Sequence, residues 1–331
     1  MIRVMEKRDI TDCVMIWNRC IDLGEFVYER MDEDRFTRIF MENPHYTEEY
    51  CLVDAGENGK VNGFICGLVK REYLRKEDFY NTPGYITMLI VRNEARRCGV
   101  GAGLLAELEN RFGVIGKKSC MMTYRNPVNL TWIIPGTDGH DHNNAPGVDM
   151  DTGGFSFFEK HGYQVNSVEL GLYRDLSTFA YSNSYYEKIK RQSQEGIVVE
   201  LYDEKRHYGF EELFDNLHGE VWRKTIQENM EKEHPLPVIV AACKDGRIVG
   251  FAGPIDRQES GRGWFNGIAT HSEFERKGIA YVMFYRLLGE FKKIGAEYSS
   301  IFTDSGNPAY SLYQKAGFET ARRWAVMEKP L

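Results

Sequence analysis

The chain has 331 residues, 42% of them hydrophobic and 27% charged, with 10 Pro and 32 Gly. This length predicts about two domains, each with its own core, and the composition excludes a disordered, fibrous or collagen-like chain. Forty-two Lys and Arg against 49 Asp and Glu give a net charge of −7, which argues against a broad nucleic-acid or anionic-membrane surface. We expect a small partner and no nucleic acid, while a local basic pocket for a phosphorylated ligand stays open.

The sequence contains no apolar run of the roughly 18 residues that a membrane span requires. Its first residues, MIRVMEKRDITDC, lack the apolar stretch and cleavage site of a signal peptide, so a cytoplasmic location is expected. The seven cysteines are an odd number without a C-x-x-C pair, and they predict reduced thiols rather than disulfides or a Cys-based zinc site.

Three sequence features occur twice in the same order. The first is a hairpin turn between apolar runs, CLVDAGENGKVNGFICGLV around Gly59 and VIVAACKDGRIVGFAGPI around Gly246, with Asn-Gly and Asp-Gly at the turns. The second is a strand, a polar loop and a Gly-rich helix start, YITMLIVRNEARRCGVGAGLL and WFNGIATHSEFERKGIAYVMF. The third is a helix that ends in Gly before a strand, FSFFEKHGYQV and AYSLYQKAGFET, with Gly162 and Gly317 as helix stops.

The repeat predicts a mixed α/β fold in two tandem domains, each with a central mixed sheet flanked by helices. Gly99 and Gly162 are 63 residues apart but Gly278 and Gly317 only 39, so the first half carries 24 extra residues. They map to 126–154, whose Pro, Gly, Asn and Asp content predicts a long loop without regular helix or strand. We therefore expect a first domain at 1–176 with this inserted loop, a weakly helical linker at 177–195 with KIKR at 188–191 on a solvated face, and a second domain at 196–331.

The helix after each Gly-rich start shows apolar residues on one side only, which predicts packing against a sheet. These residues are Val100, Leu104, Leu105, Leu108 and Phe112 in the first half, and Ile279, Val282, Met283, Leu287 and Phe291 in the second.

A glycine-rich turn into a helix brings backbone N–H groups and the positive helix end close to an anion, so phosphate is the expected guest. Two common phosphate loops are excluded. Leu104 and Leu105 stand where the nucleotide loop needs Lys and Ser or Thr, and Leu104 also stands where the dinucleotide pattern needs its third glycine.

The run Arg96-Arg97-Cys98-Gly99-Val100-Gly101 resembles the acyl-CoA pyrophosphate loop of the GCN5-related N-acetyltransferase (GNAT) family, which reads Gln/Arg-x-x-Gly-x-Gly/Ala. The second half has Glu275-Arg276-Lys277-Gly278-Ile279-Ala280, where Glu275 departs from the family pattern and would repel phosphate. Asn307 and the later run Leu312-Tyr313-Gln314-Lys315-Ala316-Gly317-Phe318 resemble the family's later helix. The tandem arrangement is reminiscent of mycothiol synthase-like members.

The resemblance implies acetyl-CoA as co-substrate, with its pantetheine along the fourth strand and its pyrophosphate on the Gly-rich loop. The residues implied for this are Leu89, Val91, Arg96, Arg97, Cys98, Gly99, Val100, Gly101 and Ala102 in the first half, and Ile268, Thr270, Arg276, Lys277, Gly278, Ile279, Ala280 and Asn307 in the second.

Tyr313 occupies the family's position for the acid that protonates the departing thiolate, whereas its counterpart in the first half is Phe158, which has no proton to give. We therefore favour the second half as catalytic and the first as an acyl-CoA-binding copy, although a water or another side chain could replace the acid in the first half. No general base is singled out: Glu297, Asp304 and an ordered water are equal candidates.

The resulting hypothesis is an acetyl-CoA-dependent N-acetyltransferase in which a primary amine of a small molecule or peptide attacks the thioester directly. The alternative is a non-catalytic acyl-CoA-binding or sensing protein. Asp138, His140, Asp141 and His142 on the inserted loop have side chains that suit a metal, but their spacing is poor evidence for a site and we expect none. The acidic balance mildly favours a cationic acceptor, and the oligomeric state is not predicted.

Overall fold

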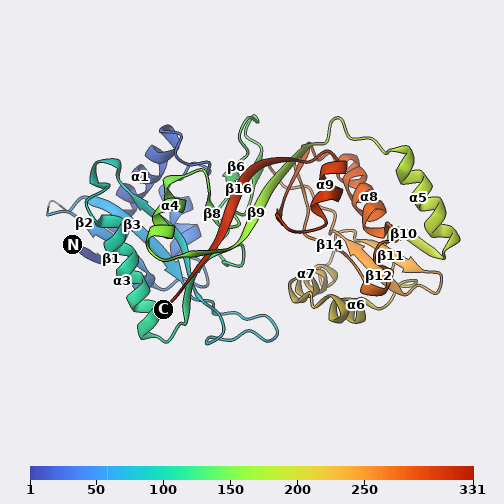
Figure 1. The fold of residues 1–331 in the computed structure, drawn as a ribbon, viewed down its shortest axis with the longest axis horizontal. Helices are drawn as coiled ribbons and strands as arrows, with labels where there is room; N and C mark the ends of the chain where they lie inside the picture. Colours follow the sequence, from blue (N-terminus) through green and yellow to red (C-terminus); the bar gives the residue numbers. More distant parts are fainter. Residues whose placement is uncertain (58) are drawn as a thin grey trace. The chain divides into compact units, whose positions relative to one another are not determined.

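The computed structural model describes residues 1–57 and 59–331, and it divides into two compact units (Figure 1). Unit 1 comprises Met1–Gly171, Phe302–Ser305 and Ala321–Leu331, and unit 2 comprises Leu172–Ile301 and Gly306–Thr320. The C-terminal segment thus belongs to the first unit. The domain boundaries expected from the repeat, at 176 and 196, stay a prediction.

Among its described residues, the first half of the chain contains nine strands and four helices, of which Ile10–Asp22 and Val100–Val114 are the longest helices. Its strands are β1 (Ile2–Val4), β2 (Cys51–Ala55), β3 (Val61–Leu68), β4 (Gly84–Val91), β5 (Ser119–Met122), β6 (Trp132–Ile133), β7 (Asp141–His142), β8 (Val148–Asp149) and β9 (Gln164–Asp175). Its helices are α1 (Ile10–Asp22), α2 (Glu33–Phe36) with a π-helical continuation at Thr37–Met41, α3 (Val100–Val114) and α4 (Gly153–Lys160), with 3₁₀ turns at Lys7–Asp9, Glu48–Tyr50 and Asn93–Ala95.

The second half repeats this order after a connecting helix. Its helices are α5 (Asn183–Gln194), α6 (Phe210–Leu217), α7 (Glu220–Met230), α8 (Ile279–Lys293) and α9 (Tyr310–Lys315), with a 3₁₀ turn at Ser272–Phe274. Its strands are β10 (Ile197–Leu201), β11 (Ile239–Cys243), β12 (Ile248–Ala252), β13 (Arg262–Trp264), β14 (Ile268–Thr270), β15 (Tyr298–Asp304) and β16 (Glu319–Pro330).

The sheet of unit 1 runs β1-β2-β3-β4-β5-β16, with β9 beyond β16. Neighbouring strands from β1 to β4 are antiparallel, β4 and β5 are parallel, and β16 pairs antiparallel with β5. The residues Met327 to Pro330 of β16 lie opposite Met122 to Ser119 of β5. The C-terminal strand therefore completes the sheet of unit 1.

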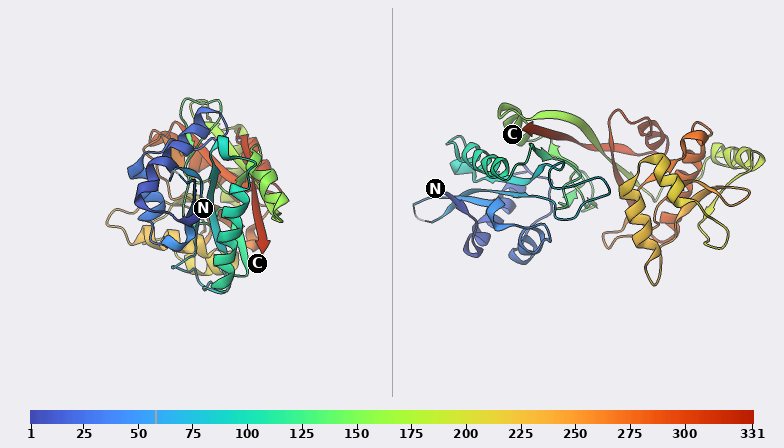
Figure 2. Two further views of the ribbon diagram at one scale, coloured as in Figure 1. Left: turned by 90° about the vertical axis from the view of Figure 1, so that its left-hand side faces the viewer. Right: turned by 90° about the horizontal axis from the view of Figure 1, so that it is seen from below.

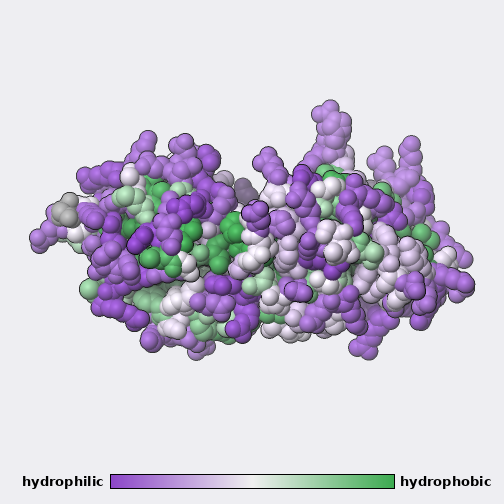
Figure 3. All heavy atoms as spheres, turned by 90° about the horizontal axis from the view of Figure 1, so that it is seen from above, coloured by the Kyte–Doolittle hydropathy of each residue, from purple (hydrophilic) through white to green (hydrophobic). Residues whose placement is uncertain are grey.

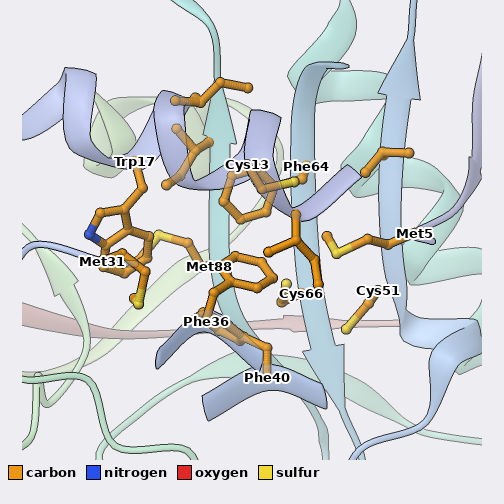
Figure 4. Close-up of a cluster of buried hydrophobic side chains, with 14 of the residues drawn as sticks. Met5, Cys13, Trp17, Met31, Phe36, Phe40, Cys51, Phe64, Cys66 and Met88 are labelled. Carbon is orange, nitrogen blue, oxygen red and sulfur yellow. The ribbon is translucent and has the colours of Figure 1, made fainter. Parts of the chain in front are cut away.

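Helices cover both faces of this sheet, with α1 and α2 on one side and α3 on the other (Figure 2). Successive side chains of a strand point to opposite faces. Phe64 accordingly packs under α1 with Trp17 and Phe36 (Figure 4), while its neighbour Ile65 packs under α3 with Leu108. The mixed α/β fold with a helix-flanked sheet, expected from the sequence, is confirmed.

Unit 2 contains a four-stranded antiparallel sheet in the order β10-β11-β12-β14. The strand equivalent to β4 is broken here: β13 pairs in parallel with β15, β14 pairs with β12, and 265–267 lie between the two pieces. Gly267 has a φ of +138°, and the Trp222 ring lies so close that any side chain at Gly267 would collide with it. Helices α6 and α7 share the core of this sheet through Leu213, Phe214 and Ile226.

The repeated sequence features are confirmed as repeated structure. The apolar residues predicted to face a sheet are buried in α8, and in α3 all are buried except Val100, which is half-buried. The helix stops have the expected left-handed backbone, with φ of +88° at Gly162 and +83° at Gly317. Asn58, half of the first predicted turn, lies outside the described residues.

The structure corrects one expectation about the connecting segments and agrees with another. The inserted stretch 126–154 is not wholly irregular, since β6 and β7 form a short antiparallel pair and β8 pairs with β16. The linker is helical as predicted, over Asn183–Gln194. Within the described ranges, no helix combines the length and apolar character that crossing a bilayer requires.

Candidate functional site

Strands β4 and β5 of unit 1 part after a short paired stretch. Their parallel pairing joins Gly84 with Cys120 and Tyr85 with Met121, at the start of β4. A cavity of about 760 Å³, including space open to solvent, lies where they part. Its walls come from β4 and β5, from the segment after α1, from the inserted stretch and from α4: Phe26, Tyr28, Ile86, Thr87, Met88, Leu89, Met122, Thr123, Asn126, Val128, Leu130, Ala145, Gly147, Val148, Asp149, Thr152, Gly154 and Phe158.

The cavity wall is mostly apolar, with a few polar side chains held in place. Asn126 Nδ2 donates to Thr87 Oγ1 at 3.0 Å, and Thr152 Oγ1 donates to the carbonyl of Asp149 at 2.9 Å. This composition is typical of a small-molecule site, where apolar walls provide contact area and fixed polar groups provide orientation. Apolar residues also reach the surface of unit 1 among polar ones (Figure 3).

The predicted pyrophosphate loop of unit 1 joins β4 to α3. Arg97 has a φ of +61° and Gly99 one of +84°, so the chain turns sharply just before the helix begins. The first N–H groups of α3 have no acceptor within the helix. A Cβ added at Gly99 would meet no atom within 4 Å, and Arg97, Cys98 and Gly99 are exposed, so this helix end is open to an anion.

Arg96 holds this loop in place through an ion pair and is only partly exposed. Its guanidinium forms a two-point ion pair with Glu25 at 2.6 and 2.8 Å, and its Nε donates to the Val91 carbonyl at 3.0 Å. The hydrogen bonds from Arg96 hold the pKa of Glu25 below its usual value. Arg96 therefore fixes the end of β4 to the end of α1, and Arg97 is the loop cation that is free to meet a phosphate.

Gly101, in the first turn of α3, packs closely against two side chains. A Cβ there would lie 3.4 Å from both Phe157 Cε2 and Val91 Cγ2. This is ordinary contact distance, so an alanine fits but a longer side chain must turn toward the open helix end. Val100 and Ala102 flank Gly101 in the same turn.

The corresponding loop of unit 2 has the same backbone, but side chains of α5 approach its glycine. Arg276 has a φ of +59° and Gly278 one of +75° at the start of α8, with Lys277, Ile279 and Ala280 beside them. A Cβ at Gly278 would lie 3.5 Å from Lys188 Cδ and 3.8 Å from Gln192 Nε2, and Gln192 Nε2 donates to the Lys277 carbonyl at 3.4 Å. Side chains of α5 thus partly cover Gly278, whereas Arg276 and Lys277 are exposed. Lys188, expected on a solvated face, is partly buried.

Tyr313 of α9 is enclosed by aromatic rings in unit 2. Its ring centroid lies 5.0 Å from that of Phe284 and 6.1 Å from that of Phe265, which comes from the break between β13 and β14. The side chain is 5% exposed, and burial raises the pKa of Tyr313 to about 12. The phenol is therefore protonated at neutral pH, as an acid must be.

Ile268, Thr270 and Asn307, also predicted for unit 2, lie in β14 and in the turn before α9. Ile268 and Thr270 pair with Ala252 and Gly250, and the Thr270 hydroxyl is buried without a hydrogen-bond partner. Asn307 Oδ1 accepts from the Ala309 N–H at 2.9 Å and so fixes the turn into α9.

Phe158 lines the cavity of unit 1 at the position that Tyr313 has in the repeat, and Thr152 lies six residues before it, as Asn307 does before Tyr313. Tyr28 is the phenol in this wall. Burial raises the pKa of Tyr28, and the nearby charge of Asp149 adds to that effect.

The His140-Asp141-His142 segment packs as part of the fold. His142 is buried with its ring stacked on Trp132 at 5.9 Å, and its Nδ1 accepts from the Asn144 N–H at 3.1 Å. Among the described residues, no three His, Cys, Asp or Glu side chains are grouped to hold a metal.

Asp149 and its partner Arg322, like Tyr28, were not predicted from the sequence. Asp149, in the cavity wall, is 6% exposed and pairs with Arg322 of β16, whose Nη2 lies 2.8 Å from Asp149 Oδ2. The inserted stretch holds several aspartates, and only its position next to the C-terminal strand distinguishes Asp149. The pairing joins residues 173 positions apart, which no local sequence signal reveals.

Two α/β units, each with a sharp loop ahead of its longest helix, define a tandem acetyltransferase fold. A family model described as the acetyltransferase (GNAT) family matches residues 17–126 and 198–318, one stretch in each repeat. The chain therefore belongs to the GNAT acetyltransferase family. A search of curated proteins found no match.

Solved structures with the same fold share little sequence with this chain. A GCN5-related N-acetyltransferase from Sphaerobacter thermophilus has a TM-score of 0.61 and 14% identity, covering 100% of this chain and 95% of that one. A tandem GNAT protein from the clavulanic acid biosynthesis pathway has a TM-score of 0.58 and 12% identity, covering 100% and 98%. A glucosamine N-acetyltransferase region of a fungal multi-domain β-N-acetylglucosaminidase has a TM-score of 0.73 and 16% identity, and there this chain spans 99% of its own length but 38% of the other.

Proposed function

We propose that this protein is an acetyl-CoA-dependent N-acetyltransferase that acts on a primary amine of a small molecule or peptide, and that unit 1 carries the reaction. One observation carries the proposal: an open, glycine-started helix end stands at the end of the same strand, β4, that lines a cavity. In unit 2 side chains of α5 partly cover the corresponding glycine, and Glu275 at the mouth of the loop would repel phosphate. This assignment differs from our expectation from Tyr313, which favoured the second half.

The residues of unit 1 suit acetyl-CoA. The first N–H groups of α3 and the Arg97 guanidinium would hold the pyrophosphate, since a helix N-terminus favours negative charge. Beyond its short pairing with β5, the edge of β4 that includes Leu89 is free to hydrogen-bond with pantetheine. Acetyl-CoA supplies the activated acyl group, and the apolar wall excludes water from it.

Acetyl transfer also needs a proton for the departing thiolate. Phe158 cannot supply one, whereas Tyr28 lines the cavity and a phenol is protonated at neutral pH. We therefore propose Tyr28 as the proton donor of unit 1, with Tyr313 as the donor should unit 2 carry the chemistry.

The test measures acetyl-CoA binding and acetyl transfer separately. Acetyl-CoA at about 100 times its dissociation constant should raise the free energy of unfolding by about 2.7 kcal/mol, seen as a higher melting temperature. Cys98 is the exposed cysteine of the loop, so bound CoA should also slow its alkylation, measured by peptide mass spectrometry. An unchanged melting curve and unchanged alkylation at millimolar acetyl-CoA would overturn the proposal.

The second candidate is a non-catalytic acyl-CoA-binding protein, which Phe158 at the acid position favours. Release of CoA with a panel of polyamines, aminoglycosides, amino acids and peptides distinguishes the two. Binding without release across the panel would favour the binder.

We also propose the cytoplasm as the compartment. All seven cysteines are free thiols, and five of them are buried, which suits a reducing environment.

A further inference from the structure

Asp149 is a charged group set into an otherwise uncharged cavity wall. Among the described residues that line the cavity, it alone carries a formal charge at neutral pH. A buried ion pair is weak evidence for stability, because apolar side chains of similar size often serve as well. The position of Asp149 in the wall therefore points to a ligand.

The Asp149 carboxylate is held in one orientation by the chain. Arg322 Nε lies 3.0 Å from both carboxylate oxygens and Nη2 2.8 Å from Oδ2, while the Asp151 N–H donates to Oδ1 at 3.0 Å. Arg322 Nε shares one hydrogen between the two oxygens, so three donor hydrogens serve a group with about four lone-pair sites, which leaves capacity for about one more. Asp149 is thus preorganised to accept one further donor from the cavity.

The cavity wall also suits a cation on an apolar chain. Phe26 and Tyr28 place their ring centroids 5.6 Å apart in the wall, and aromatic faces attract ammonium groups. Met88 and Leu89 of β4 add apolar surface that a methylene chain can cover.

The group that pairs with Asp149 cannot be the attacking nitrogen. An amine must be neutral to attack a thioester, whereas a neighbouring carboxylate stabilises the protonated form of an amine. A cation bound to Asp149 is therefore a second group, and the reacting amine lies elsewhere on the same molecule.

We propose that Asp149, held by Arg322, is the acceptor-binding residue of unit 1, and that it selects acceptors with a second cationic nitrogen, such as aliphatic diamines. This inference rests on the proposed acetyltransferase function. Asp149 lies in the inserted stretch, which has no counterpart in the second repeat, so the selection is a property of the first unit. Arg322 acts through Asp149 as a positioning residue.

The test compares two probes of equal length, 1,5-diaminopentane and 5-amino-1-pentanol. Both are titrated by calorimetry into the full-length protein saturated with free CoA, which cannot transfer acetyl. The diamine should bind at least about tenfold more tightly than the amino alcohol, because a hydrogen bond to a charged group contributes more than one between neutral groups. Equal affinities would overturn the proposal.

The preference should depend on Asp149 alone. Asp149→Asn should remove it, and Asp138→Asn is the matched control, because Asp138 lies in the same inserted stretch, is exposed and is absent from the cavity wall. If Asp149→Asn does not fold with Arg322 unpaired, the double variant Asp149→Asn with Arg322→Gln leaves no unpaired charge and should also lose the preference. A preference retained in either variant would overturn the proposal.

Acetyl transfer separates this inference from the function on which it rests. If the diamine binds through Asp149 but no acetyl is transferred, the cation site is upheld and the proposed acetyltransferase function is overturned. Transfer that favours 1,5-diaminopentane no more than the amino alcohol upholds the transferase and overturns the role of Asp149.

Discussion

Tyr28 and Tyr313 offer two phenols for the same task, one in each unit. Tyr28→Phe keeps the ring and removes the proton, so kcat should fall by about 10²–10⁴-fold, the usual contribution of a general acid. Tyr313→Phe is the matched control and should leave kcat nearly unchanged, with a stability loss below about 1 kcal/mol. Steady-state kinetics and thermal melts measure both. The opposite pattern would move the reaction to unit 2.

Lys117 predicts that the free energy of unfolding depends on pH, independently of catalysis. It is 2% exposed, its Nζ donates to the carbonyls of Phe79 and Thr82 at 2.6 and 3.0 Å, and burial lowers the pKa of Lys117 from 10.5 to about 8. Between about pH 8 and 10.5 the unfolded chain then binds more protons than the folded one, so the free energy of unfolding should rise with pH.

Urea unfolding of the parent and of Lys117→Met at about pH 7.5 and about pH 10 measures this effect. The variant loses stability at both values, because the carbonyls of Phe79 and Thr82 lose their donor. The difference in free energy of unfolding between parent and variant should grow toward high pH. A constant difference would show that burial does not shift the pKa of Lys117.

At the residue scale, the sequence predicts local geometry better than partners. Gly162 and Gly317 have the left-handed backbone that was expected of helix stops. The Arg96–Glu25 pair and the Asp149–Arg322 pair join residues 71 and 173 positions apart, and neither leaves a periodic or local signal. Partners of this kind depend on how distant strands are placed.

The helix starts α3 and α8 share one sequence pattern, but the second is partly covered by α5 and carries Glu275, so we expect one acetyl-CoA per chain. Gly101→Asp should abolish binding, because its carboxylate repels phosphate at the helix end. The same charge favours the helix itself, so the fold should persist. Ala280→Asp should change nothing, since Glu275 and the side chains of α5 already disfavour phosphate at that loop. Calorimetric stoichiometry of the parent and both variants measures this.

Gly101→Ala is the control for added volume, because its Cβ would stand at ordinary contact distance from Phe157 and Val91. It should bind acetyl-CoA nearly as the parent does. A parent that binds two molecules, or one lost only with Ala280→Asp, would contradict the assignment to unit 1.

At the element scale, the helical periodicity of apolar residues predicts which face of a helix is buried. The one-sided apolar pattern of α3 and α8 predicted their buried faces, since an amphipathic helix buries its apolar face whatever sheet receives it. The parting of β4 from β5 and the break between β13 and β14 could not be predicted in this way. The parting depends on where β4 and β5 stop pairing. The break depends on the ring of Trp222, a residue of α7 that packs against Gly267. Neither cause is visible in the sequence of the strands themselves.

At the scale of the whole molecule, a linear repeat implies two domains that follow one another, yet Ala321–Leu331 belong to unit 1. A strand pattern predicts that a segment enters a sheet, but not which of two similar sheets receives it. Trp324 and Met327 of β16 are fully buried there, and β16 also holds Arg322 against Asp149. The candidate acceptor site therefore depends on residues from the far end of the chain.

This dependence predicts how the first repeat behaves by itself. A fragment of residues 1–176 lacks β16, so the edge of β5 is unpaired and the buried side chains of Trp324, Ala325 and Met327 are missing from its core. Removing large buried apolar groups costs about 2–5 kcal/mol each, which is enough to unfold a marginally stable domain. The fragment should show no cooperative melting and no acetyl-CoA binding.

Adding the missing strand should reverse both losses. Residues 319–331 joined to the fragment by a flexible Gly/Ser linker, or supplied as a peptide, should restore a cooperative melt and acetyl-CoA binding, since β16 pairs with β5 and β8 through backbone hydrogen bonds. The same peptide with Trp324→Ala and Met327→Ala is the control: it keeps the backbone but loses the buried groups, and it should restore little. A fragment of 1–176 that folds and binds acetyl-CoA unaided would show that the first repeat is complete without the C-terminal strand.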